Sequence, residues 1–177
     1  MRSNLPFIAW STLVALALVV CSVAAWQLWR PYGHREAFFR SVDSALQNSA
    51  SHHDGAFPDG RDPYKALQSL FPDYVNPGYE LAGLSGNIKG VASALLAGQS
   101  ISNLTSWVYV PGLRTNDDPR IAILWESKAG FHPSGRLSFR RIRPVLLLNR
   151  EITNVPVSHW EGFLKDQEKL RGAIKHD

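Results

Sequence analysis

The sequence predicts an α+β fold, in which a long N-terminal transmembrane and amphipathic helix packs on a small antiparallel sheet and a C-terminal helix follows. Three observations predict it. Residues 5–29 carry no charge, residues 38–46 place apolar side chains at helical spacing, and residues 106–155 contain short β-branched and aromatic runs. We expect an anchor over 1–30, an amphipathic extension over 31–53 and an α+β globular domain over 54–177.

The whole chain has the composition of a globular protein with one domain. It has 177 residues, of which 45% are hydrophobic. The formal charge of +4 is modest and does not indicate a nucleic-acid partner, so none is expected. Cys21 is the only cysteine, which excludes a disulfide within the chain.

The N-terminal segment predicts a single membrane-spanning helix that binds the lipid bilayer through residues 5–29. About 20 apolar residues cross a hydrocarbon layer of ~30 Å as a helix. Trp10 lies near one end of the segment and Trp26 and Trp29 lie at the other, where aromatic side chains meet the interface. Lysine and arginine counts on the two sides differ too little to fix the orientation.

Two processed forms are the alternatives to an intact anchor. A cleaved signal peptide has a shorter apolar core, whereas this one continues to Trp26. A lipoprotein signal would fit Leu18, three residues before Cys21, but Val20 stands where a small residue is expected. We therefore expect an uncleaved anchor, with Cys21 as an ordinary apolar residue of the helix.

Three further helices are expected before the sheet. The first covers residues 34–52, and a Gly- and Pro-rich segment at 54–63 ends it. A second covers 63–71, with Asp62 as N-cap and Pro63 at the first position, and a third covers 89–98. The apolar face of the first helix consists of Phe38, Phe39, Val42, Ala45 and Leu46.

Five short runs predict strands of an antiparallel sheet, at 106–112, 120–126, 135–139, 145–148 and 151–155. Asn149 and Arg150 form a tight connection between the last two, with a positive φ expected at Asn149. Ser158 and Glu161 predict a capping box at the start of the C-terminal helix. The inner face of that helix is formed by Trp160, Phe163, Leu164, Gln167 and Leu170.

This order of features resembles type IV pilins and type II secretion pseudopilins, in particular the pilin-like proteins of planctomycetes and verrucomicrobia. The segments that carry the resemblance are "GAFPDG" (55–60), "LQSLFPDYVNPG" (67–78), "WVYVPGL" (107–113), "NDDPRIAILWE" (116–126), "GFHPSGR" (130–136) and "VLLLNREITNV" (145–155). The prepilin processing motif is degenerate, because no glycine precedes the apolar stretch and no glutamate lies within it.

The resemblance implies a structural, non-enzymatic protein of a type II secretion or pilus-like assembly. It implies a single-pass protein of the inner membrane with a periplasmic domain, and contacts with other pilin-like subunits through the N-terminal helix. No cofactor and no catalytic residue are expected. The competing hypothesis is a membrane-tethered periplasmic ligand-binding or enzymatic domain, with His132, Asp117 and Asp118 near one pocket.

Metal sites are weighed against simpler interpretations. His52, His53 and Asp54 are the one cluster with ligand chemistry, but a polar helix end explains them better, and no metal site is expected. Residues 116–118 offer oxygen ligands, and pseudopilins bind calcium in a loop of this region; a turn begun by aspartate before a proline is the favoured interpretation.

A basic run lies before the last two predicted strands, and comprises Arg136, Arg140, Arg141 and Arg143. Such a run suits an anionic partner, either lipid headgroups or nucleic acid. Arginines that guard an exposed strand edge against mispairing are the favoured explanation. His132 is interpreted as a loop residue bonded to the backbone.

Overall fold

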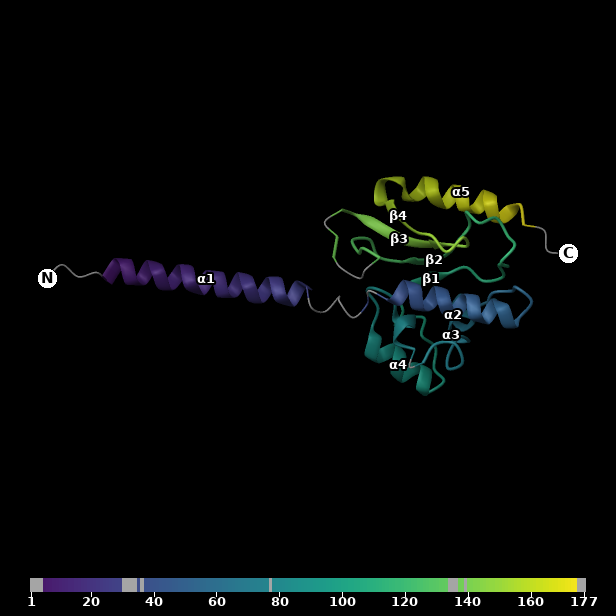
Figure 1. Cartoon of the computed structure of the whole chain (residues 1–177), viewed down its shortest axis with the longest axis horizontal. Helices are drawn as coiled ribbons and strands as arrows, with labels where there is room; N and C mark the ends of the chain where they lie inside the picture. Colours follow the sequence, from purple (N-terminus) through teal and green to yellow (C-terminus); the bar gives the residue numbers. More distant parts are fainter. Residues whose placement is uncertain are drawn as a thin grey trace.

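A four-stranded antiparallel sheet with helices on both faces forms the domain (Figure 1). The computed structural model describes residues 5–29, 35, 37–76, 78–133, 137–138 and 140–174. Its elements are helices α1 (Leu5–Trp29), α2 (Phe38–His52), α3 (Pro63–Gln68), η2 (Tyr79–Ala82) and α4 (Ile88–Leu96), strands β1 (Trp107–Tyr109), β2 (Ala122–Glu126), β3 (Ile142–Leu147) and β4 (Ile152–Pro156), and helices η3 (Val157–His159) and α5 (Trp160–Gly172). The coarse prediction of an α+β fold with an antiparallel sheet and a C-terminal helix is confirmed.

Helix α1 coincides with the predicted apolar segment and extends away from the globular domain (Figure 1). Its side chains are described for residues 13–25, and all of them are exposed, with Leu13 at 70% and Leu16 at 67% of their full accessible surface. Counted over the part of the chain that the structure describes, no helix is both long enough and apolar enough to cross a lipid bilayer.

Helix α2 packs its predicted apolar face into the main core, as Phe38, Phe39, Val42, Ala45 and Leu46 are all buried. The Phe39 ring meets Trp107 of β1 edge-on, with 4.5 Å between ring centroids. The helix begins at Phe38, four residues later than predicted, and the start of the predicted extension at 31–34 lies outside the described residues.

Helices α3 and α4 begin where the sequence indicates, because each has a side-chain cap. Asp62 Oδ1 accepts the Tyr64 amide at 2.9 Å, and Asn87 Oδ1 accepts the Gly90 amide at 3.0 Å. Helix α3 ends at Gln68, three residues before the predicted end. The predicted end at Phe71 directly precedes Pro72, and a residue in that position disfavours helical backbone.

The strand order is β1-β2-β3-β4, so β1 and β4 are the edges. The predicted strand at 135–139 does not form among its described residues, where Leu137 makes only an isolated bridge to Phe131. Strand β3 instead begins three residues earlier than predicted, at Ile142, because it pairs along its whole length with β4.

The connection between β3 and β4 differs from the prediction in one residue. Arg150, not Asn149, has the positive φ, at 69°. Asn149 instead uses its side-chain oxygen to accept the Glu151 amide at 3.0 Å. The guanidinium of Arg150 reaches back to Asp43 of α2 at 3.0 Å, which fixes the side chain of a residue in an otherwise unfavourable conformation.

Helix α5 covers the face of the sheet opposite α2 (Figure 1), where Trp160 packs against Trp125, Val145 and Val155. Buried Gln167 fixes the helix to β2, since its Oε1 accepts the Ala122 amide at 2.7 Å. The predicted capping box is wrong. Ser158 belongs to the short helix η3, and α5 begins at Trp160 after His159 without a side-chain cap.

Candidate functional site

The residues of the enzymatic hypothesis do not meet. Asp118 lies just before β2, where its carbonyl accepts the Ile121 amide, whereas His132 follows the far end of the same strand. The five residues of β2, at about 3.3 Å each, span roughly 17 Å between the two ends of the strand. Asp117 lies on the Asp118 side, so these three residues belong to opposite ends of β2.

The loop aspartates are held by neighbours in the same turn. Asp118 forms a two-point ion pair with Arg120, at 3.0 Å from Nε and 2.6 Å from Nη2, and Asp117 Oδ2 accepts the Arg114 amide at 2.7 Å. The hydrogen bonds from Arg120 lower the pKa of Asp118 to about 2. The turn interpretation fits this bonding.

The histidine pair lies exposed at the end of α2. His52 Nδ1 lies 3.2 Å from the Tyr74 hydroxyl, and His53 Nδ1 lies 2.7 Å from the Ser49 carbonyl. Across the described residues there is no group of three or more histidine, cysteine, aspartate or glutamate side chains suited to one metal ion.

The basic run lies at one end of the sheet, and the edge-guard explanation fails for Arg143. This residue belongs to β3, an interior strand, and its guanidinium carbon lies 4.6 Å from the centre of the Trp160 ring. Arg140 and Arg141 precede β3 and are exposed. Arg136 lies outside the described residues.

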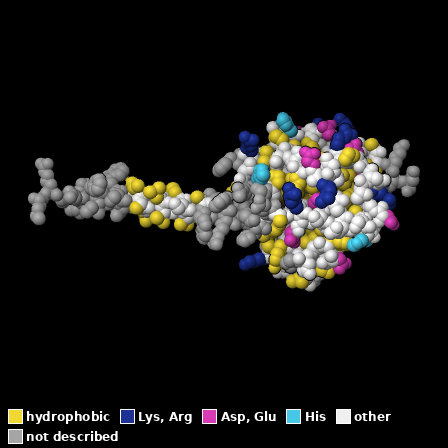
Figure 2. Space-filling model, viewed as in Figure 1, with side chains coloured by type: hydrophobic (Ala, Val, Ile, Leu, Met, Phe, Trp, Pro, Cys, Tyr) yellow, Lys and Arg dark blue, Asp and Glu magenta, His cyan; other side chains and the backbone are white. Residues whose placement is uncertain are grey.

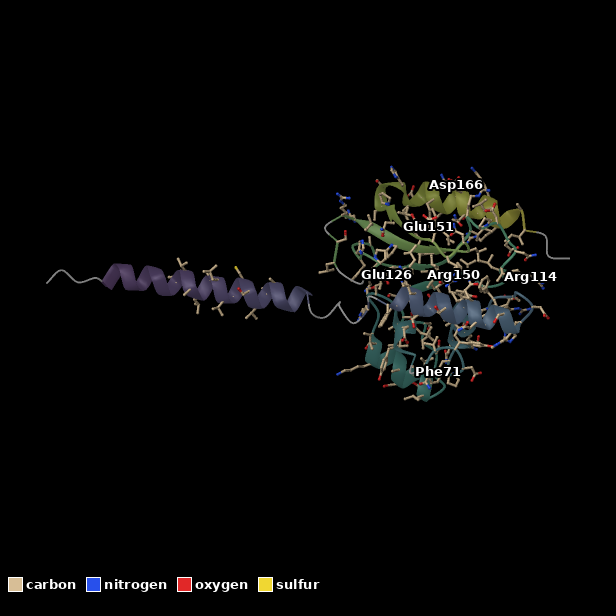
Figure 3. All side chains as sticks on the ribbon, in the orientation of Figure 1. Phe71, Arg114, Glu126, Arg150, Glu151 and Asp166 are labelled. Atoms are coloured by element: carbon tan, nitrogen blue, oxygen red, sulfur yellow. The ribbon has the colours of Figure 1, made fainter. Side chains whose placement is uncertain are left out.

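A buried carboxylate occupies the same end of the sheet, and the sequence analysis did not single it out. Glu126 ends β2, is fully buried, and lies on the α1 side of the domain (Figure 3). Its Oε2 accepts the Leu84 amide at 2.9 Å and the Ser106 hydroxyl at 2.8 Å, and its Oε1 accepts the Ser85 hydroxyl at 2.6 Å. We call these four residues the Glu126 network.

The carbonyl groups of the same loop bind an arginine that precedes α2. The Arg35 guanidinium donates to Gly83 O and Gly86 O at 3.1 Å each, and also to Leu84 O. The loop 83–86 is thus held from two sides, by a cation on its carbonyls and by a carboxylate on one amide. We call this end of the domain, where β1 and β3 begin and β2 and β4 end, the α1-proximal end.

Burial decides the electrostatics of Glu126. Desolvation raises the pKa of its carboxyl above the ordinary value, and the hydrogen bonds from Ser85 and Ser106 oppose that shift. Because the side chain is 0% exposed, no solute can reach it. The network can therefore hold the loop in place, and it offers no accessible nucleophile or base.

Gly83 and Gly86 allow loop 83–86 to lie directly against Ser106 and the neighbouring backbone, and the Glu126 network depends on this contact. Gly83 has a φ of 81°, and a side chain there would collide with Ser106; a side chain at Gly86 would collide with the carbonyls of Ala82 and Leu104. The sequence contains a signal for the Glu126 network, namely the two glycines in "GLSG" and a glutamate directly after the apolar run "IAILW".

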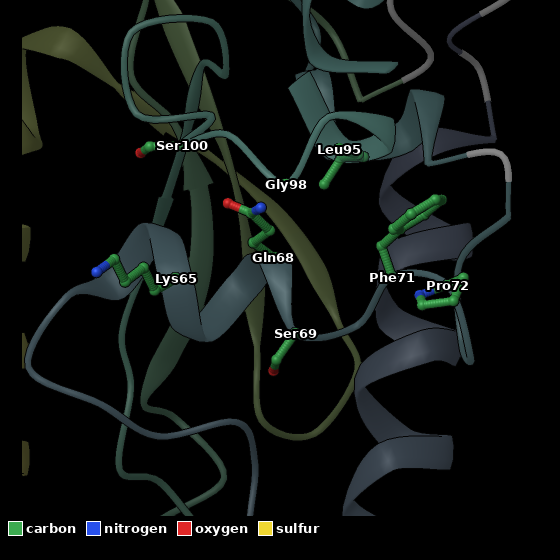
Figure 4. Close-up of a pocket in the computed structure, with 8 residues that line it drawn as sticks. All are labelled: Lys65, Gln68, Ser69, Phe71, Pro72, Leu95, Gly98 and Ser100. Atoms are coloured by element: carbon green, nitrogen blue, oxygen red, sulfur yellow. The ribbon is translucent and has the colours of Figure 1, made fainter. Parts of the chain in front are cut away.

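Hollows also lie elsewhere on the domain, and two of them have polar side chains in their lining. One, of about 540 Å³, lies between α3 and the end of α4, and its lining includes Phe71 and Leu95 together with Lys65 and Gln68 (Figure 4). A second, of about 470 Å³, includes His53, Asp59, Asp73 and Tyr74 among its lining residues. Neither contains His132, Asp117 or Asp118.

Comparisons with known proteins leave the fold and site to be interpreted from their own geometry. No protein-family model, no curated protein and no solved structure matches this chain.

Proposed function

We propose that this chain is a membrane-anchored, pseudopilin-like structural protein, held in the inner membrane by residues 5–29 with its domain on the periplasmic side. It presents that domain within a type II secretion or pilus-like assembly and contacts other subunits through the N-terminal helix. The proposal includes no enzymatic activity.

The observation that carries it is the exposure of an apolar helix outside the domain. Large side chains from Leu13 to Val23 are 51–70% exposed, and Figure 2 displays them as an apolar surface along α1. Residues 13–25 of α1 carry no charge and are all exposed, and an apolar surface of this kind favours an apolar environment, either lipid or another helix.

The domain itself supports a structural role in two ways. Its carboxylate of raised pKa is sealed inside and bonded on both oxygens, and the acid and histidine candidates lie at opposite ends of β2. The order of α1, α2 and a four-stranded antiparallel sheet also matches the layout that the resemblance implies.

Membrane fractionation of the full chain tests the anchor. We expect the protein to remain in membranes after a sodium carbonate wash, and Leu16→Arg with Val19→Arg to release it, because each arginine at a helix centre costs about 2.5–3.5 kcal/mol of insertion. Leu16→Ile with Val19→Leu is the matched control and should stay bound. A wild-type chain that is soluble without detergent would refute the anchor.

Oxidative cross-linking in those membranes tests the assembly. Cys21 is exposed on α1 and is the only cysteine, so a dimer linked through it reports contact between N-terminal helices. Cys21→Ser is the control. A membrane-bound chain that yields no cross-linked dimer would argue against assembly through this helix and leave the anchor intact.

A further inference from the structure

The exposed cations at the α1-proximal end gather on one surface. Strand pairing places them there: Ile142 at the start of β3 pairs with Pro156 at the end of β4, and Arg141 O accepts the Val157 amide at 2.8 Å. Trp107 pairs with Glu126, and the Glu126 network meets the loop that Arg35 binds. Because Glu126 lies on the α1 side of the domain (Figure 3), the strand pairing puts Arg140 and Arg141 at the α1-proximal end as well.

These cations can meet an external anion. Lys128, Arg140 and Arg141 are exposed, and none of them forms an ion pair with a residue that the structure describes. Exposed cations without such a pair also occur elsewhere on the domain, for example Lys89 and Arg114. What distinguishes Lys128, Arg140 and Arg141 is their position at the α1-proximal end beside apolar groups.

Acidic side chains do little to neutralise this surface. Among the described acids of this end, Glu126 is fully buried, Glu80 is half-buried, and only Glu161 in the first turn of α5 is exposed. At ordinary ionic strength charges act over about 10 Å, so the local balance matters more than the net charge of the whole chain.

Apolar groups lie beside the cations. Arg140 and Arg141 line a hollow of about 520 Å³ together with Ile142, Pro156 and Val157. The neighbouring Leu137 is 46% exposed. A surface that combines arginines with exposed apolar side chains suits the region between lipid headgroups and acyl chains, where both kinds of group find partners.

We infer that this surface, formed by Lys128, Leu137, Arg140, Arg141 and Val157, contacts the phosphates of anionic phospholipids in the membrane that holds α1. The inference rests on the proposed anchor, which keeps the surface beside the bilayer. Membrane is favoured over nucleic acid because the arginines lie at the end of the domain joined to α1, and because apolar side chains accompany them.

The test uses the full chain in nanodiscs, with a fluorophore on Ser158→Cys in a Cys21→Ser background and an acceptor dye on the lipid headgroups. Ser158 is exposed and lines the hollow. Energy transfer should be higher in discs with 30% phosphatidylglycerol than in phosphatidylcholine alone, and 0.5 M salt should remove the difference. A label on Ser51→Cys, exposed at the far end of α2, should respond neither to phosphatidylglycerol nor to salt.

Arg140→Gln with Arg141→Gln should abolish the lipid dependence at Ser158, since two basic residues near an anionic surface together change binding about 30-fold. Arg114→Gln with Lys169→Gln removes the same charge elsewhere and should preserve it. Failure of the chain to co-elute with nanodiscs refutes the anchor itself. Co-elution without a phosphatidylglycerol effect overturns only this inference, as would a Ser158 signal that responds to inorganic phosphate or DNA and not to lipid composition.

Discussion

Replacement of Glu126 by alanine should destabilise the domain more than any single change of a surface acid. The variant removes the acceptor for the Leu84 amide and for the Ser85 and Ser106 hydroxyls. A buried donor left without a partner costs about 1–3 kcal/mol. Ser106 can turn toward the Ala82 carbonyl, 3.2 Å away, whereas the Leu84 amide has no such choice.

We expect a net loss of about 2–4 kcal/mol in the free energy of unfolding, because removal of a desolvated carboxylate offsets part of the cost. This corresponds to a fall in Tm on the order of 10 °C for a domain of this size. The assay is thermal unfolding of the full chain in mild detergent, followed by near-UV circular dichroism. Glu168→Ala, at an exposed position of α5, is the control. A Tm for Glu126→Ala equal to that of the control would refute the assigned role.

The pH dependence gives an independent test with Glu126→Gln. Because burial raises the pKa of Glu126 above its ordinary 4.5, the folded domain takes up this proton at a higher pH than the unfolded chain does. The stability from protonation is complete below 4.5 and is lost as the pH rises through the raised value. As the pH falls from 8 to 5, the wild type should therefore gain stability relative to Glu126→Gln. A constant difference would mean that burial does not perturb this carboxyl.

Three further changes test separate parts of the domain. Gln167→Leu should cost about 1–3 kcal/mol by denaturant unfolding, since it leaves the Ala122 amide without an acceptor; an unchanged midpoint would contradict the role given to Gln167. Gly86→Ala should cost about 1–3 kcal/mol in the same assay, because its Cβ meets backbone carbonyls that cannot rotate away, and wild-type stability would show that the loop yields. Asp118 should remain ionised at pH 3 in a carbon-detected NMR titration, and Arg120→Gln should return its pKa toward 3.8; a normal pKa in the wild type would exclude the ion pair in solution.

The helices of the domain were predictable because local signals and burial agree. The apolar face of α2 and the Asp62 cap of α3 are both encoded within a few residues of the elements that they define. The start of the C-terminal helix shows where such local signals fail. Ser158 and Glu161 have capping-box spacing, yet the backbone after β4 turns first through η3, because Val157 is held by the Arg141 carbonyl.

Strand boundaries and the site depended on contacts distant in sequence. Strand β3 includes Ile142 and Arg143 because β4 pairs with them, and a periodicity within 145–148 cannot reveal that partner. Judged from the residues next to it in the sequence, Glu126 resembles an ordinary exposed residue at the end of a strand. Its burial follows from loop 83–86, about 40 residues away, whose amide and hydroxyl groups replace water around the carboxylate.

The α1-proximal end combines a buried charge with exposed ones, and the two have different physical consequences. An apolar side chain at position 126 would fill space, but it could not satisfy the Leu84 amide, so the backbone of loop 83–86 would lose a fixed position. Arg35 binds that backbone just before α2 begins, and the position of loop 83–86 therefore constrains how the chain enters the domain from α1. The exposed Arg140 and Arg141 do not support the fold, so their loss should alter only what lies outside it. Glu126 variants should accordingly lower the stability of the domain. Arg140→Gln with Arg141→Gln should weaken the lipid contact and leave the midpoint of unfolding at the wild-type value.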